Sequence, residues 1–279
     1  MRTCKLCGTL VLAFDVFFFA SHATATDAVI TDKTGAKATV SNLKSHRHDE
    51  CGSPFLINVF GGSTETDFYY DFLEVNMGEY EVRIPFEIIK AVTVHKMTDP
   101  EKTQSEQNIY AVLLSDGTEI KGVPTRVNEF VASTDLGEFT ISTGGVKDIV
   151  FPKQPSLSFS ASPCGENSAT LVLLDGSQLR VNGAAIMCEK KNRNGCHAGE
   201  EYLQSFKFNV GESQYDIAWG KISSIVLSVS GNIKLIAKTG IELDGAAQNV
   251  LGVQGIAKIG KFTLRVTVPF DSKASKIIF

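Results

Sequence analysis

The chain has 279 residues, with 31 Asp and Glu against 27 Lys and Arg, and a formal net charge of −4 at pH 7. This acidic balance argues against binding to nucleic acid or to an anionic membrane surface, because both need a basic face. With 43% hydrophobic residues, the chain can bury one large core or several small ones.

The first 25 residues have the organisation of a cleaved signal peptide. Arg2 and Lys5 precede an apolar segment, and Ala23 and Ala25 form a small-residue cleavage site. The apolar segment is short for a membrane span. The absence of an Asn-x-Ser/Thr site favours a bacterial source. We therefore expect an exported protein, periplasmic or extracellular, that is not an integral membrane protein.

From residue 28 onward the chain repeats one sequence pattern. The pattern consists of an apolar run, a turn that contains glycine, and a run in which apolar and polar residues alternate. The clearest copies are "VLLSDGTEIKG" at 112–122 and "LVLLDGSQLRVNG" at 171–183. Glycine supplies the positive φ angles that tight hairpin turns need. The turn glycines are Gly35, Gly117, Gly176 and Gly240. A second pattern, a glycine-led strand followed by an apolar strand, starts at Gly78, Gly137, Gly211 and Gly260.

In the second pattern, apolar and polar residues alternate with a period of two. In the first copy, Tyr80, Val82, Ile84 and Phe86 share one face, and Glu79, Glu81 and Arg83 share the other. This pattern is typical of a half-buried strand, and no stretch after residue 25 sustains a helical period. The sequence therefore predicts an all-β protein.

We predict four tandem small β-barrel or β-sandwich-like repeats after the signal peptide, which occupies 1–25. They span 26–97, 108–153, 166–229 and 231–279. A small propeller is the alternative for four repeated units. The order of strand, Asp-Gly turn, bent strand, glycine-led hairpin and closing strand resembles the Sm-like small β-barrel. The resemblance implies the small-barrel fold alone. It does not imply RNA binding, because the Asp and Asn with which that family holds RNA have no counterpart after Gly122.

Units one and three carry insertions at the same point, and such insertions often form the binding side of a repeat array. They hold three of the four histidines that follow the signal peptide, His46, His48 and His197. We expect these two insertions, whose loops carry His46 to Tyr70 and Glu189 to Glu200, to lie on one side of the array and to form the partner surface. The candidate partner surface consists of His46, His48, Tyr69, Tyr70 and His197.

Three hypotheses compete for the insertions. His46, His48, Cys51 and His197 could ligate a metal, although their spacing matches no established zinc pattern. A second hypothesis is an aromatic platform for a sugar or peptide, formed by Phe55, Phe60, Phe68, Tyr69, Tyr70 and Phe72. The third, an extra β-hairpin of "FLINVF" (55–60) and "DFYYDFLEV" (67–75) with those rings in its own core, is favoured. We predict no metal and no cofactor.

Four cysteines follow the signal peptide, and in an exported protein they predict disulfides. Cys188 and Cys196 flank one polar loop, so we expect them to pair with each other. Cys51 and Cys164 then form the second pair.

Recognisable catalytic motifs are weak in this sequence. Asp116 and Asp175 occupy turn positions that hairpin geometry explains, and Trp219 belongs to an apolar strand. We therefore predict a non-enzymatic binding or scaffolding protein of the cell envelope with a protein or glycan partner. The alternatives are an outer-membrane β-barrel protein and an exported enzyme without a local motif.

Overall fold

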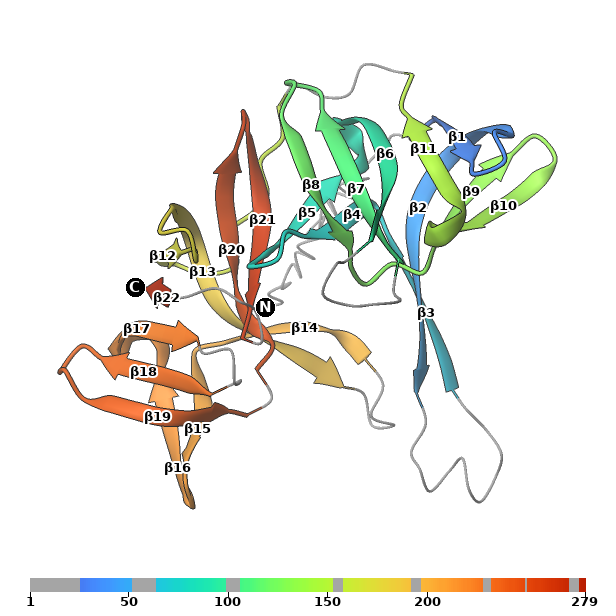
Figure 1. Ribbon diagram of the computed structural model, residues 1–279. Coiled ribbons are helices and arrows are strands. Elements are labelled where there is room, and N and C mark those ends of the chain that lie inside the picture. Colours follow the sequence, from blue (N-terminus) through green and yellow to red (C-terminus); the bar gives the residue numbers. More distant parts are fainter. Residues whose placement is uncertain are drawn as a thin grey trace, which may run out of the picture.

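The computed structural model describes residues 26–51, 64–98, 106–152, 158–191, 197–227, 232–248, 250–270 and 276–279. Over these residues the chain forms twenty-two β-strands and three short 3-10 turns, with no α-helix (Figure 1). The all-β prediction is confirmed. The predicted signal peptide lies outside the described residues. In the described part, no helix is long and apolar enough to cross a membrane.

The strands fall into two halves of eleven. The first half consists of β1 (Ala28–Asp32), β2 (Lys37–Cys51), β3 (Thr64–Tyr70), β4 (Phe72–Asn76), β5 (Glu81–Pro85), η1 (Phe86–Ile88), β6 (Ile89–Thr98), β7 (Glu106–Leu114), β8 (Glu119–Pro124), β9 (Glu129–Thr134), β10 (Gly137–Ser142), η2 (Thr143–Gly145) and β11 (Val146–Val150). The second half consists of β12 (Asn167–Val172), β13 (Gln178–Lys191), β14 (His197–Leu203), β15 (Ser205–Val210), β16 (Ser213–Ala218), η3 (Trp219–Lys221), β17 (Ile222–Leu227), β18 (Ile233–Ala237), β19 (Glu242–Ala247), β20 (Gly252–Ile259), β21 (Phe262–Pro269) and β22 (Lys276–Ile278).

All strand pairings are antiparallel, and they join the strands into four groups of five. The first half contains β10-β9-β2-β1-β11 and β6-β7-β8-β4-β5, which meet through β11–β6. The second half contains β21-β20-β13-β12-β22 and β17-β18-β19-β15-β16, which meet through β22–β17. Two further strands, β3 and β14, extend β2 and β13 into long hairpins (Figure 1).

The two halves share one pairing pattern. Each of the ten pairings within the first half has a counterpart eleven strands later. Even the irregularities agree, because β2 shifts register against β9 at Asn42, and β13 shifts against β20 at Gly183. Both residues have φ 56, as expected where a bulge needs a left-handed residue.

The four predicted units do not form separate bodies. Strand β1 of unit one pairs with β11 of unit two, and β2 pairs with β9. In return β4 and β6 of unit one pair with β8 and β7 of unit two. Units three and four exchange strands in the same way. Period-two alternation shows which face of a strand is buried and leaves its partner strand unspecified, so the sequence did not reveal this exchange.

The turns form where the glycines predicted them. Gly117 has φ 91 and Gly176 has φ 81. A residue with a side chain adopts such positive φ angles only at an energetic cost. The preceding acids fix these turns, since Asp116 accepts from the Thr118 N–H at 2.9 Å and Asp175 from the Ser177 N–H at 2.8 Å. The turn role predicted for both aspartates is confirmed.

One apolar core runs through the described strands. Val82 and Ile84 are fully buried, as their alternation predicted. Trp219 is also core, 4% exposed and with its ring 4.2 Å from that of Phe279, centroid to centroid. The alternation therefore identifies the apolar core positions of β5 correctly.

Candidate binding groove between the two halves

The two halves meet through one strand pairing among the described strands, β5 with β21. It places Glu81, Val82 and Arg83 opposite Thr267, Val266 and Arg265. Loop contacts support this junction, because the Lys261 N–H donates to Asp116 at 2.7 Å and the Leu174 N–H donates to Glu79 at 2.9 Å. The junction therefore fixes the position of the second half against the outer face of the β4–β5 hairpin.

That outer face carries charged side chains that the second half covers. Glu74 lies directly opposite Arg83 in the β4–β5 ladder, and their side chains are 2% and 12% exposed. The equivalent pair of the second half has the charges reversed, with Lys207 opposite Asp216. Both of those residues are exposed. The same position thus serves as solvent face in one half and as interface in the other.

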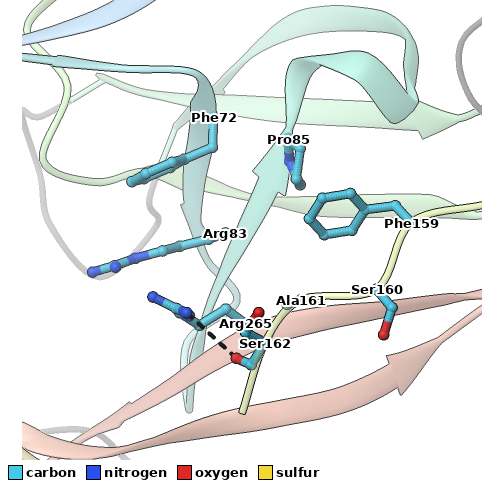
Figure 2. Close-up of a pocket in the computed structure, with 8 residues that line it drawn as sticks. All are labelled: Phe72, Arg83, Pro85, Phe159, Ser160, Ala161, Ser162 and Arg265. Carbon is cyan, nitrogen blue, oxygen red and sulfur yellow. Dashed lines mark hydrogen bonds between the residues drawn. The ribbon is translucent and has the colours of Figure 1, made fainter. Parts of the chain in front are cut away.

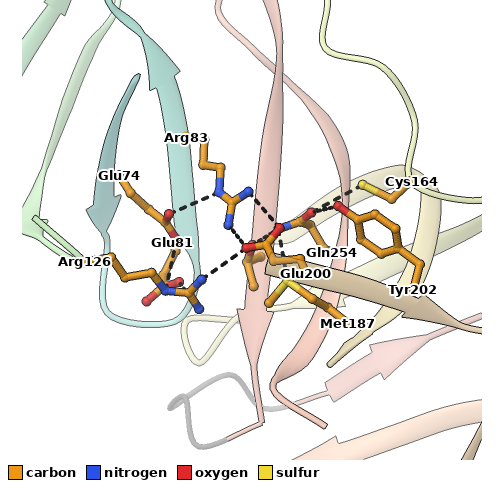
Figure 3. A network of polar contacts seen from close by, with 10 residues as sticks. Glu74, Glu81, Arg83, Arg126, Cys164, Met187, Glu200, Tyr202 and Gln254 are labelled. Atoms are coloured by element: carbon orange, nitrogen blue, oxygen red, sulfur yellow. Dashed lines mark hydrogen bonds and ion pairs between the residues drawn. The ribbon is translucent and has the colours of Figure 1, made fainter. Parts of the chain in front are cut away.

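The buried charges form a network that joins the halves (Figure 3). Arg83 donates from Nε to Glu74 at 3.1 Å and from Nη1 to Glu200 of β14 at 2.9 Å. Arg126 donates to the same Glu200 carboxylate at 3.2 Å. Burial raises the pKa of Glu200, but the hydrogen bond and charge of Arg83 outweigh it and hold that pKa below its ordinary value.

Arg126 has a strained backbone. It lies in the short connection from β8 to β9 with φ 55, a left-handed conformation that is uncommon for a residue with a Cβ. Its guanidinium reaches Glu200, and its Nε and Nη2 atoms lie 3.8 Å from Glu74 and 3.9 Å from Glu81. Strain of this kind persists where surrounding contacts over-determine it, and it is common at binding sites.

Glu81 is the third carboxyl of the network. Burial, with the added charge of Glu74, raises the pKa of Glu81 to about 7. The Glu74 Oε1 and Glu81 Oε2 atoms are both buried without a hydrogen-bond partner. The proton that Glu81 binds near neutral pH reduces its repulsion with Glu74.

A neutral polar cluster fixes β14, the strand that carries Glu200. The Tyr202 hydroxyl donates to Gln254 Oε1 at 2.6 Å, and Gln254 Nε2 donates to Thr267 at 2.8 Å (Figure 3). Gln254 is fully buried, and burial raises the pKa of Tyr202. Buried, satisfied polar groups of this kind fix one geometry. These hydrogen bonds therefore connect β14, the strand of Glu200, to β20 and β21.

Two adjoining cavities lie along this junction, and Phe72 and Arg83 line both. One of about 210 Å³ is also lined by Phe68, Tyr70, Glu74, Arg126 and Glu200. The other, of about 290 Å³, is also lined by Pro85, Phe159, Ser160, Ala161, Ser162 and Arg265 (Figure 2). We call the two together the junction groove.

Aromatic rings from the first insertion line one wall of the groove. The Phe68 and Tyr70 rings stack at 6.4 Å between centroids, and the Tyr70 and Phe72 rings lie 4.9 Å apart. The Arg83 guanidinium lies 5.2 Å from the Phe72 centroid, close enough for a cation–π contact. The third hypothesis paired 55–60 with 67–75, but 55–60 lies outside the described residues, and in the β2–β3 hairpin 64–70 pairs with 45–51. The Phe68, Tyr70 and Phe72 rings are half-buried in the groove. Phe55 and Phe60 lie outside the described residues.

The predicted partner-surface residues divide into two sets. Tyr70 lines the groove beside Glu200, so side chains of both insertions meet there. His46, His48 and Tyr69 instead gather on the β2–β3 hairpin, where the 55% exposed Tyr69 ring stacks on His46 at 4.6 Å. The side chain of His197 lies outside the described residues.

The hairpin histidines are bound to carboxylates. His46 is 7% exposed and contacts Glu129 at 2.7 Å and Asp67 at 3.0 Å, and His48 contacts Asp67 at 2.9 Å. These hydrogen bonds, that of His48 first, lower the pKa of Asp67. By register Asp67 is the counterpart of Glu200, so both carboxylates bind two basic side chains. Within the described residues, no group of three or more His, Cys, Asp or Glu is placed to hold a metal ion.

The predicted disulfides are not present among the described cysteines. Cys164 and Cys188 are free thiols, and the Cys164 thiol lies 3.5 Å from Gln254 Oε1. In the β13–β14 ladder Cys188 lies opposite Glu201. The side chains of Cys51 and Cys196 lie outside the described residues.

Several groove residues had no signal in the sequence. Arg83 and Glu81 looked like an ordinary solvent face, and nothing marked Arg126, Phe159 or Arg265. Only pairing between strands far apart in the chain brings them together. A comparison with protein-family models, with curated proteins and with solved structures found no match to this chain.

Proposed function

We propose that this chain is an exported, non-enzymatic binding protein of the cell envelope, and that the junction groove is its partner surface. The observation that carries the proposal is the meeting of both insertions in one cavity, with Tyr70 of β3 and Glu200 of β14 on its walls. Sequence insertions at equivalent loops of a repeated fold often serve recognition. The export part of the proposal rests on residues 1–25.

The residue types in the groove favour a protein partner. Tyrosine, phenylalanine and arginine are enriched at the centres of protein interfaces, where they contribute most of the binding energy. Tyr70 and Phe72 offer half-buried rings, and the ion pairs of Arg83 hold the wall behind them in place. A preformed wall lowers the entropy that binding costs.

The charged groups of the groove support a binding role over a catalytic one. Arg83 and Arg126 donate to Glu200, and Arg83 also donates to Glu74. Groups bound to one another in this way give a fixed shape and a fixed potential. They are therefore suited to recognition.

Capture from envelope extract tests the proposal. The Tyr70→Ala variant should lose capture of the partner by at least about tenfold, the effect of removing an interface residue worth roughly 1.4 kcal/mol or more. Tyr215→Ala is the matched control, because Tyr215 is 43% exposed on β16, away from the groove. Extract treated with protease should no longer supply the partner. Equal capture by the folded Tyr70→Ala variant and the wild type would refute the proposal, and a protease-resistant partner would favour a glycan.

A further inference from the structure

The larger cavity of the junction groove contains Arg265, an arginine that forms no direct ion pair within the described residues, although its charge helps to lower the pKa of Glu200. Arg265 of β21 lies directly opposite Arg83 of β5, and like charges at such positions repel. Arg83 is compensated by Glu74 and Glu200. Arg265 has no carboxylate within ion-pair distance in the described part of the chain, and its one hydrogen bond there is to the Ser162 carbonyl at 3.4 Å.

The geometry around Arg265 matches a planar anion. A guanidinium has five N–H donors arranged to hold a carboxylate through two parallel hydrogen bonds, and one weak bond to Ser162 leaves most of them available. Figure 2 shows the Arg83 and Arg265 side chains extending to the same side below the Phe72 ring, with the Phe159 ring across the cavity. The two rings provide apolar walls for a flat group attached to the anion.

The ion pairs of the cluster do not include Arg265. Glu74 and Glu200 bind Arg83 and Arg126. Within the described residues no carboxylate lies at ion-pair distance from Arg265, so one anionic group fits beside it. The volume of about 290 Å³ is at the lower end for ligand pockets, so the cavity suits one ring with its acid group.

We propose that this cavity is a subsite for a carboxylate carried next to an aromatic ring. Arg265 binds the carboxylate, and Phe72 and Phe159 enclose the ring. The same chemistry occurs in the C-terminal residue of a polypeptide and in a small aromatic acid. The inference rests on the proposed function, because the cavity is one part of the partner surface.

Calorimetric titration of the full-length protein with N-acetylphenylalanine tests this subsite. N-acetylphenylalaninamide has the same ring without the charge, and it should bind at least about tenfold more weakly, since it cannot form charge-assisted hydrogen bonds with Arg265. Arg265→Gln should lose the binding of the acid by a similar factor. Arg180→Gln, at an exposed arginine on β13, should bind the acid as the wild type does.

A hexapeptide that ends in phenylalanine, with a free or an amidated C-terminus, separates the two sources. Tighter binding of the free peptide than of N-acetylphenylalanine identifies a polypeptide terminus, and equal or weaker binding identifies a small acid. Equal affinity for the acid and the amide, or unchanged acid binding by folded Arg265→Gln, would overturn the subsite. Capture of a partner that depends on Tyr70 while the acid fails to bind would refute the subsite and leave the proposed function intact.

Discussion

Arg83 and Glu200 come from opposite halves of the chain and form a buried ion pair, with 2.9 Å between Arg83 Nη1 and Glu200 Oε2. Arg83 belongs to β5, which pairs with β21 of the second half. The ion pair and this strand pairing therefore join the same two halves. At the equivalent place in the second half, Lys207 and Asp216 face solvent. The chain thus uses one hairpin design twice, once as an interface and once as a free edge.

Loss of the Glu200 carboxylate should destabilise the junction strongly. Glu200→Ala leaves Arg83 and Arg126 without their shared partner, and breaking a buried pair typically costs about 3 kcal/mol or more. Urea denaturation measures this loss. Glu242→Ala removes the exposed pair with Lys234 and should change the free energy of unfolding by less than about 1 kcal/mol. Similar small effects of both variants would contradict the network described here.

Glu81 should make stability depend on pH. Its pKa is about 7 in the folded protein, above its ordinary value of 4.5, so the folded state holds the proton more tightly than the unfolded state. The contribution of Glu81 to the free energy of unfolding is therefore largest below about pH 4.5, and it decreases as the pH rises to 7.

Glu81→Gln should abolish this dependence and gain on the order of 2 kcal/mol over the wild type at pH 8. Denaturation curves between pH 5 and 8 provide the measurement. Glu242→Gln, at an exposed carboxyl, should retain the wild-type slope. A wild-type slope in the Glu81→Gln variant would show that another group is responsible.

Two glycines should be equally intolerant of a side chain, because they are counterparts in the two halves. A Cβ at Gly122 would lie 2.2 Å from the Asn76 carbonyl oxygen, and one at Gly245 would lie 1.9 Å from that of Asn209. Gly122→Ala and Gly245→Ala should each cost roughly 1–3 kcal/mol, the usual cost of overpacking. Gly220 has open space around it, so Gly220→Ala is the control in thermal melts. Tolerance at only one of the two sites would weaken the equivalence of the halves.

Cys164 and Cys188 should be recovered as free thiols. Alkylation of the unfolded protein without reductant, followed by peptide mapping, should modify both residues. Recovery of a Cys188–Cys196 link would contradict the free thiol at Cys188.

The sequence was sufficient to predict the strands and their turns. Positive φ angles at Gly117 and Gly176, and full burial of Val82 and Ile84, follow from short-range patterns. The exchange of strands between units could not be predicted, because hydrophobic alternation determines a face and leaves the partner open.

The groove also could be predicted only in part, because local sequence patterns do not specify contacts between distant strands. Tyr70 and the Glu200 segment were predicted as partner surface from their insertions, and the structure places them in one cavity. Arg83 carried the pattern of a solvent-facing residue, yet its side chain is 12% exposed. Its burial depends on β21, a strand about 180 residues later, and no local pattern contains that contact.

Hydrogen exchange of the protein with and without its captured envelope partner tests the central claim most directly. Binding at the junction groove predicts slower exchange in β3 and β4, in residues 158–163 and in β14. The free edges β10 and β16 should exchange at the same rate in both states. Protection confined to β10 or β16, with unchanged exchange in β3, β4 and β14, would contradict the account.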